Sequence, residues 1–73
     1  MDNPIALLDE IRRLMELKGE NPFKIRAYEK ASQLLAGRKD LRDRAFAGTL
    51  TELEGVGRGI SDTLTEFFTQ GKC

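Results

Sequence analysis

Hydrophobic residues recur every three or four positions along most of this chain, which is the spacing of one face of a helix. The first such segment lies between Asn3-Pro4 and Gly19. An asparagine before a proline is typical of a helix start, and a glycine is typical of a helix end. We therefore predict a helix over this range, with this apolar face: Leu7, Leu8, Ile11, Leu14 and Met15.

A second segment repeats the same start and stop signals between Asn21-Pro22 and Gly37. Its apolar positions again have helical spacing, and two of them are alanines, which leave room for a neighbouring helix. Ile25 falls outside this stripe and has no place in it. The predicted buried face consists of Phe23, Ala27, Ala31, Leu34 and Leu35.

Shorter helical patterns follow. One helix is predicted to begin near Asp40 and to end at Gly48, and Thr51 then caps a single turn that ends at Leu53. The apolar residues of that helix are Leu41, Ala45 and Phe46.

The last helix is predicted from about Gly59 to Thr69, with Gly71 closing it. Its apolar side consists of Ile60, Leu64, Phe67 and Phe68. No segment alternates polar and apolar residues with the period of a strand. The sequence thus predicts an all-α fold, a compact bundle of four to five short helices in a single domain, residues 1–73.

Composition narrows the class of protein. The 73 residues are 40% hydrophobic and 33% charged, which is typical of a small soluble domain. No apolar run approaches the roughly 18 residues of a membrane span, so we expect no membrane partner. Histidine is absent, which removes His-based triads and most zinc sites. The single cysteine, Cys73, predicts no internal disulfide, an inert terminal thiol and a cytoplasmic location, on the nucleoid if the source is bacterial.

Charge is unevenly distributed although the net charge is zero. Residues 24–44 carry seven basic and three acidic side chains, whereas the segments on either side are net acidic. A basic middle third is either a face for a polyanion or an ordinary solvated helix surface.

The stretch GVGRGISDTL, residues 55–64, places three glycines in five positions directly before the last predicted helix. The spacing is not the G-x-G-x-x-G of a dinucleotide site, and no Gly-Lys-Ser/Thr of a P-loop follows. We expect Gly55 and Gly57 to permit positive φ angles in a tight turn. Backbone N–H groups in such a turn, continued by those of a helix start, make an anion site. Alternatively, the glycines merely allow a sharp corner between helices.

Three further features bear on that choice. Leu53, Val56 and Ile60 are spaced to hold the turn against the helices, and Arg58 places a basic group inside it. Upstream lies GENPFKIRAYEKA, residues 19–31. Together these motifs resemble the N-terminal helix-hairpin-helix domain of family X DNA polymerases, which include polymerase beta and its bacterial relatives. The resemblance extends over nearly the whole chain, to TEFFTQGK near its end.

The resemblance implies a domain that binds DNA independently of sequence and holds the 5′-phosphate side of a gap or nick during repair. Phe23 occupies the place of a side chain that stacks on a template base in some members. It is also the first residue of the apolar stripe of the second helix, which favours a position in the core. The carbonyls of Thr51, Leu53 and Val56 correspond to a site for Na⁺ or K⁺. The implied phosphate-binding residues are Lys24, Tyr28, Gly55, Val56, Gly57, Arg58 and Gly59.

Departures from the family pattern concern its lyase chemistry. Thr63 stands where the family has the lysine that forms a Schiff base, so that step loses its nucleophile. Gly59 and Thr51 replace two further basic residues of the family, and Arg58 restores one positive charge. We predict that this chain alone is not an enzyme.

Two alternatives stay open. One is a residual lyase that uses Lys24, Lys30 or the N-terminal amine, and the other is a module that binds a protein partner. The expected partners are gapped, nicked or single-stranded DNA and a polymerase or repair protein, with the chain itself a monomer. Any polymerase activity would require further domains.

Overall fold

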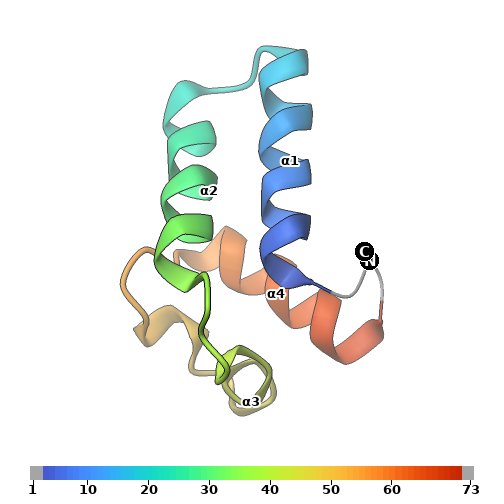
Figure 1. The fold of residues 1–73 in the computed structure, drawn as a ribbon, viewed down its shortest axis with the longest axis vertical. Coiled ribbons are helices and arrows are strands. Elements are labelled where there is room, and N and C mark those ends of the chain that lie inside the picture. The colour runs from blue at the N-terminus through green and yellow to red at the C-terminus, as the bar shows by residue number, and fades with distance from the viewer. Residues whose placement is uncertain (1–2, 72–73) are drawn as a thin grey trace. The chain divides into compact units, whose positions relative to one another are not determined.

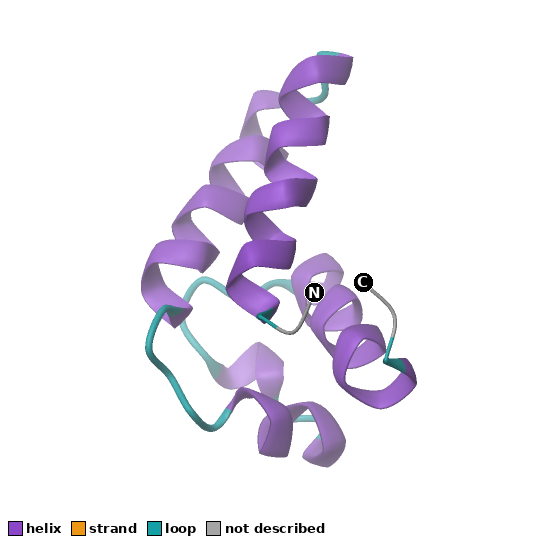
Figure 2. Ribbon diagram, turned by 45° about the vertical axis from the view of Figure 1, so that its right-hand side comes forward, coloured by secondary structure: helices purple, strands orange, loops and turns teal. Residues whose placement is uncertain are grey.

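The computed structural model describes residues 3–71, and within this range it contains helices and turns but no strand. Figures 1 and 2 show α1 (Pro4–Lys18), α2 (Pro22–Leu35), α3 (Leu41–Ala47), the 3-10 turn η1 (Leu50–Glu52) and α4 (Arg58–Gln70). The predicted all-α fold is confirmed. Cys73 and the N-terminal amine lie outside the described residues.

The chain divides between Ala36 and Gly37 into two compact units. In the first unit α1 packs along α2, and in the second α3 packs against α4 and η1. Within residues 3–71, no helix is both long and apolar enough to cross a membrane.

The boundaries of α1 and the start of α2 follow from side-chain and glycine caps. Asn3 Oδ1 accepts a hydrogen bond from the N–H of Ile5 at 2.8 Å, and Asn21 Oδ1 accepts one from Phe23 at 2.8 Å. Gly19 ends α1 in the left-handed region, as predicted. The predicted end of α2 at Gly37 is wrong by one residue, because Ala36 has already left the helical region at ψ 131°.

The predicted buried face of α2 is largely wrong. Ala31 and Leu35 are buried, but Phe23 is 79% exposed, Leu34 is 41% exposed and Ala27 is exposed. The inward face instead runs through five residues: Ile25, Tyr28, Ala31, Ser32 and Leu35. The polar Ser32 is tolerated there because its hydroxyl donates a hydrogen bond to the Glu29 carbonyl at 2.9 Å.

The predicted face of α1 holds for its first half only. Leu7 and Leu8 are buried, and Ile11 and Met15 are half-buried. Leu14, predicted to be buried, is 48% exposed, and the neighbouring Leu17 is 78% exposed. The apolar face of this helix is therefore covered near its N-terminus and open toward its C-terminus.

The second unit has an apolar core that includes a residue the sequence pattern did not single out. Leu50 in η1 is 1% exposed, and Leu64 of α4 is fully buried. Phe46, predicted to be buried, is 60% exposed, and the guanidinium of Arg42 lies 5.6 Å from its ring centre. A cation over the ring accounts for an aromatic residue at the surface. The other buried apolar residues of this unit are Leu41, Ala45, Val56 and Ile60.

The single turn before the glycines is present but has a different cap from the one predicted. Thr49, not Thr51, precedes η1, and Thr51 lies inside the turn. No side chain caps the start of η1. Backbone hydrogen bonds form the turn instead: Glu52 donates to the Thr49 carbonyl, and Leu53 donates to the Leu50 carbonyl.

Candidate nucleic-acid interface

The glycine stretch forms a tight turn between η1 and α4. The N–H of Val56 donates a hydrogen bond to the carbonyl of Leu53 at 3.2 Å, which closes a four-residue turn. Gly55 is the third residue of that turn and has φ 86°. Positive φ at this position is the requirement of a type II turn, and glycine meets it without strain. The predicted positive φ at Gly55 is confirmed.

Gly57 behaves differently from the prediction. Its φ is −87° and its ψ is −177°, an extended conformation that any residue adopts, so the expected positive φ at this position is wrong. A side chain added at Gly57 or at Gly59 would meet no atom within 4 Å. The backbone at these two positions is therefore open to solvent, and neither glycine is required by packing.

The N-terminus of α4 has no side-chain cap. Gly57 occupies the cap position, its carbonyl accepts the N–H of Ser61 at 2.9 Å, and the first turn contains no acidic residue. The first N–H groups of a helix have no partner inside the helix and carry a partial positive charge. Arg58, the first residue of α4, is exposed, and its side chain has no ion pair within residues 3–71. The start of α4 is thus positive in both backbone and side chain.

Buried apolar residues fix this end of α4 to its unit. Val56 is 6% exposed and Ile60 is 4% exposed, on either side of the open glycines. Further along α4, Leu64 is fully buried and the Phe67 and Phe68 rings meet edge to face with centres 5.1 Å apart. Buried side chains therefore hold the chain on both sides of residues 57–59, which are themselves exposed.

A cluster of four charged residues braces η1 against α3, and the sequence analysis did not find it. Asp40 accepts hydrogen bonds from Arg38 at 2.9 Å and from Arg44 at 2.9 Å, and Arg44 lies 3.6 Å from Glu52. Arg44 also donates to the Thr49 carbonyl at 3.4 Å. The hydrogen bond from Arg38, then that from Arg44, holds the pKa of Asp40 far below its usual range. The signal was present, since Asp40 and Arg44 are four residues apart at a helix start.

Lys24 and Tyr28 lie on α2, in the first unit, whereas the glycine turn belongs to the second. Lys24 is exposed, and its side chain has no hydrogen bond or ion pair within residues 3–71. Tyr28 is half-buried on the inward face of α2. Phe23 precedes them at the helix start, and its 79% exposure shows that the expected core position was wrong.

The hydroxyl of Thr63 donates a hydrogen bond to the carbonyl of Gly59 at 3.0 Å, one turn back in α4. Its side chain is half-buried. This position therefore offers a hydroxyl that is bonded to its own helix.

The three carbonyls of the predicted cation site differ in their partners. The Leu53 carbonyl accepts the Val56 N–H, whereas those of Thr51 and Val56 accept no backbone hydrogen bond from the described residues outside regular helix. Carbonyl oxygens are ligands that hard cations prefer, and Na⁺ or K⁺ at these three carbonyls stays a prediction.

A turn between two helical segments, closed by glycines and followed by an uncapped helix N-terminus, defines a helix-hairpin-helix domain. Comparison with known families confirms this class: the model of the "Helix-hairpin-helix domain" family matches residues 2–73, and the chain belongs to that family. It is also similar to the DNA polymerase/3'-5' exonuclease PolX of Bacillus subtilis (strain 168), with 38% identity over 68 residues. That alignment spans 93% of this chain and 12% of the relative. No solved structure matches the chain significantly.

These findings confirm the resemblance to the N-terminal helix-hairpin-helix domain of family X DNA polymerases. They support DNA binding in a polymerase-related setting.

Proposed function

We propose that this domain binds DNA without reading its bases and holds the 5′-phosphate at a gap or nick. The observation that carries the proposal is the uncapped start of α4, where Arg58 stands in the place usually favoured by an acid. A basic residue at a helix N-terminus is unfavourable by itself, because it adds to the positive end of the helix dipole. A phosphate bound there would offset both charges.

The turn supplies the geometry for that contact. The N–H groups at the start of α4 point out of the end of the helix, and the open backbone at Gly57 and Gly59 lets a phosphate oxygen approach them closely. Such contacts are made to the sugar-phosphate backbone, which positions a protein on DNA but carries no base information. The proposed binding is therefore independent of sequence.

In this proposal the side chains of α2, in the other unit, make DNA contacts of their own. Lys24 offers an unpaired ammonium, and Tyr28 offers a hydroxyl one helical turn later. The exposed Phe23 ring offers a flat surface on which a base can stack. Na⁺ or K⁺ bound by the Thr51, Leu53 and Val56 carbonyls would add a positive charge beside the turn.

The same residues argue against lyase activity. A Schiff base needs a neutral amine, and Thr63 has only a hydroxyl that donates to the Gly59 carbonyl. The sequence contains no histidine that could activate this hydroxyl. We therefore propose a binding role, with any chemistry carried out by a polymerase or repair enzyme acting at the same gap.

Fluorescence anisotropy with two gapped duplexes tests the proposal. The duplexes are identical except that one has a 5′-phosphate in the gap and the other has a 5′-hydroxyl. The phosphorylated duplex should bind more tightly, and the difference should disappear in Arg58→Gln/Lys24→Gln. Arg13→Gln/Lys18→Gln is the matched control, because it also removes two positive charges and both residues are exposed on α1. Equal affinity of the unmodified protein for both duplexes would refute the phosphate contact.

A borohydride trapping experiment tests the absence of lyase activity. Incised abasic DNA should give little or no covalent adduct with the unmodified protein, and Thr63→Lys should give at least some adduct. A strong adduct with the unmodified protein would show that another amine acts as the nucleophile.

A further inference from the structure

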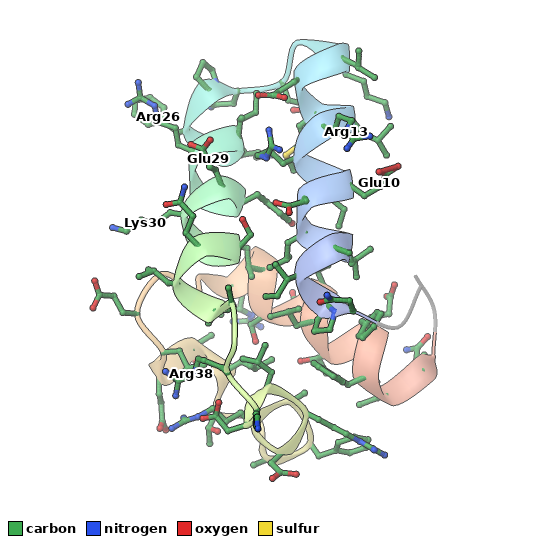
Figure 3. All side chains as sticks on the ribbon, viewed as in Figure 1. Glu10, Arg13, Arg26, Glu29, Lys30 and Arg38 are labelled. Atoms are coloured by element: carbon green, nitrogen blue, oxygen red, sulfur yellow. The ribbon has the colours of Figure 1, made fainter. Side chains whose placement is uncertain are left out.

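The outward side of α1 combines exposed leucines with charges of both signs. Residues at positions i, i+3, i+4 and i+7 fall on one face of a helix, and here they are Glu10, Arg13, Leu14 and Leu17. All four are exposed, whereas Leu8 on the other side of α1 is fully buried. Figure 3 shows Glu10 on the side of α1 that faces away from α2, with Arg13 above it. We call these four residues the α1 row.

The α1 row suits a protein partner better than a nucleic acid. Leu17 is 78% exposed and Leu14 is 48% exposed, so water covers apolar surface that a partner would bury. The acid and the base of the row, Glu10 and Arg13, lie 4.0 Å apart. Because their charges cancel, the row has no net charge that would attract a phosphate backbone.

The charges of the α1 row are complementary to themselves when two copies of α1 run antiparallel. If Glu10 of one copy faces Arg13 of the other, two-fold symmetry also places Arg13 of the first copy opposite Glu10 of the second. Each charge then has an opposite charge across the contact and another along its own helix. A parallel pair in register would instead place like charges side by side, which is unfavourable.

The same register accommodates Leu17. This residue is four positions after Arg13, and Ala6 is four positions before Glu10. The register that pairs Glu10 with Arg13 therefore also places Leu17 opposite Ala6 of the second copy. Ala6 falls on the same face of α1 and has a small side chain, so the leucine has room between the two helices.

We propose that α1 pairs with α1 of a second copy of this chain in an antiparallel, symmetric dimer. A contact between two single helices buries less than the ~1,200 Å² at which stable interfaces begin, so the dimer is weak and forms at high protein concentration. The monomer expected from the sequence is then the state at low concentration. The inference does not rest on the proposed function, because the contact uses no residue assigned to DNA.

Two variants with reversed charges test the pairing, with sedimentation equilibrium at protein concentrations up to about 1 mM. Glu10→Arg gives the α1 row two positive charges, and Arg13→Glu gives it two negative charges. Each variant alone should dissociate with a Kd raised by about 10-fold, because like charges face each other across the contact. An equimolar mixture of the two variants should associate at least as tightly as the unmodified protein, because opposite charges face each other again.

Two further variants separate this contact from general effects of charge. Leu17→Gln should raise the Kd of the dimer by about 10-fold, because an apolar side chain is lost from the contact. Glu29→Arg is the control for Glu10→Arg, since it makes the same change in charge on α2, where Glu29 points away from α1 (Figure 3). It should leave the dimer unchanged. All variants should retain the helical circular dichroism of the unmodified protein.

Three results would overturn the inference. If the protein stays monomeric at the highest concentration, the α1 row is solvated or covered by a different protein, and the dimer is refuted. If Leu17→Gln and Glu10→Arg leave association unchanged, the copies meet through another face. If the two charge variants do not associate with each other, Glu10 does not face Arg13 across the contact.

Discussion

α1 and α2 begin with the same Asn-Pro signal and have 15 and 14 residues, yet their charged residues are arranged in opposite ways. On α1, Arg12 lies between Asp9 and Glu16 at 4.0 and 3.1 Å, and Arg13 lies 4.0 Å from Glu10. On α2, the side chains of Lys24, Arg26 and Lys30 have no such partner within the described residues. The basic segment recognised in the sequence is therefore accessible on α2, whereas the arginines of α1 are neutralised.

The second unit likewise contains both a basic side chain with internal partners and one without. Arg44 is bonded to Asp40 and to the Thr49 carbonyl, whereas Arg58 is open to solvent. The turn requires the positive φ of Gly55, whereas a side chain at Gly57 would meet no atom within 4 Å. Residues with internal partners should therefore affect stability when they are changed. Residues without such partners should affect DNA binding, and the following predictions test this division.

The largest effect on stability is expected at Gly55, and Gly57 serves as the comparison. Gly55→Ala should lower the free energy of unfolding by about 1–2 kcal/mol, because alanine resists the left-handed region. Gly57→Ala should leave stability nearly unchanged but weaken binding of 5′-phosphorylated DNA, because a methyl group enters the space at the start of α4. Urea unfolding and anisotropy measure the two effects. Equal unfolding midpoints for the two variants would contradict the division.

Arg44→Gln should cost about 1 kcal/mol of stability, because it removes hydrogen bonds to Asp40 and Thr49 and the ion pair with Glu52. Affinity for DNA, measured on the folded fraction, should not change. Lys39→Gln is the control, since Lys39 is exposed in the same unit and has no partner within residues 3–71. If Lys39→Gln destabilises the protein as much as Arg44→Gln does, the cluster is not a brace.

Arg58→Gln should have a smaller effect on stability, and one of opposite sign. Removing a positive charge from the start of α4 should raise the free energy of unfolding by about 0.3–1 kcal/mol, because the charge opposes the helix dipole. The same change should weaken binding of 5′-phosphorylated DNA. Thermal unfolding and anisotropy together give the two signs, and a loss of stability would show that Arg58 has a structural role.

The smallest effect concerns acid stability, because the Asp40 carboxylate is solvent-exposed. Its pKa is lowered in the folded protein by hydrogen bonds from Arg38 and Arg44, so its contribution is present above the unfolded pKa of about 3.9. That contribution should be lost as the pH falls from about 4 toward the folded pKa. Asp40→Asn should therefore reduce the loss of stability between about pH 5 and pH 3. An unchanged pH dependence would argue against the pairing.

Element positions could be predicted from the sequence because their signals are local. The Asn-Pro starts of α1 and α2 and the glycine ends at Gly19 and Gly48 act through neighbouring backbone groups. The end of α2 was misplaced because Ala36 leaves the helix without a glycine. Local chemistry thus gave the helices and most of their limits.

Which face of each helix is buried could not be read from apolar spacing alone. Ser32 is buried with its hydroxyl bonded to its own helix, and Phe46 is exposed with the guanidinium of Arg42 over its ring. Phe23 continues the apolar spacing yet lies at the surface. For the site, the positive φ of Gly55 followed from the turn, and the extended backbone of Gly57 follows from its position as the N-cap of α4. The pairing of Arg44 with Asp40 had a local signal, whereas its ion pair with Glu52 depends on tertiary structure.

Tyr28, half-buried on α2 beside Lys24, has a spectroscopic consequence. It is the single tyrosine of a chain that has no tryptophan, so intrinsic fluorescence excited in the tyrosine band arises from this one ring. Unfolding would move the ring from a partly apolar surrounding into water, and a phosphate at its hydroxyl would change its emission without unfolding. The unlabelled protein therefore carries its own optical reporter at the α2 site.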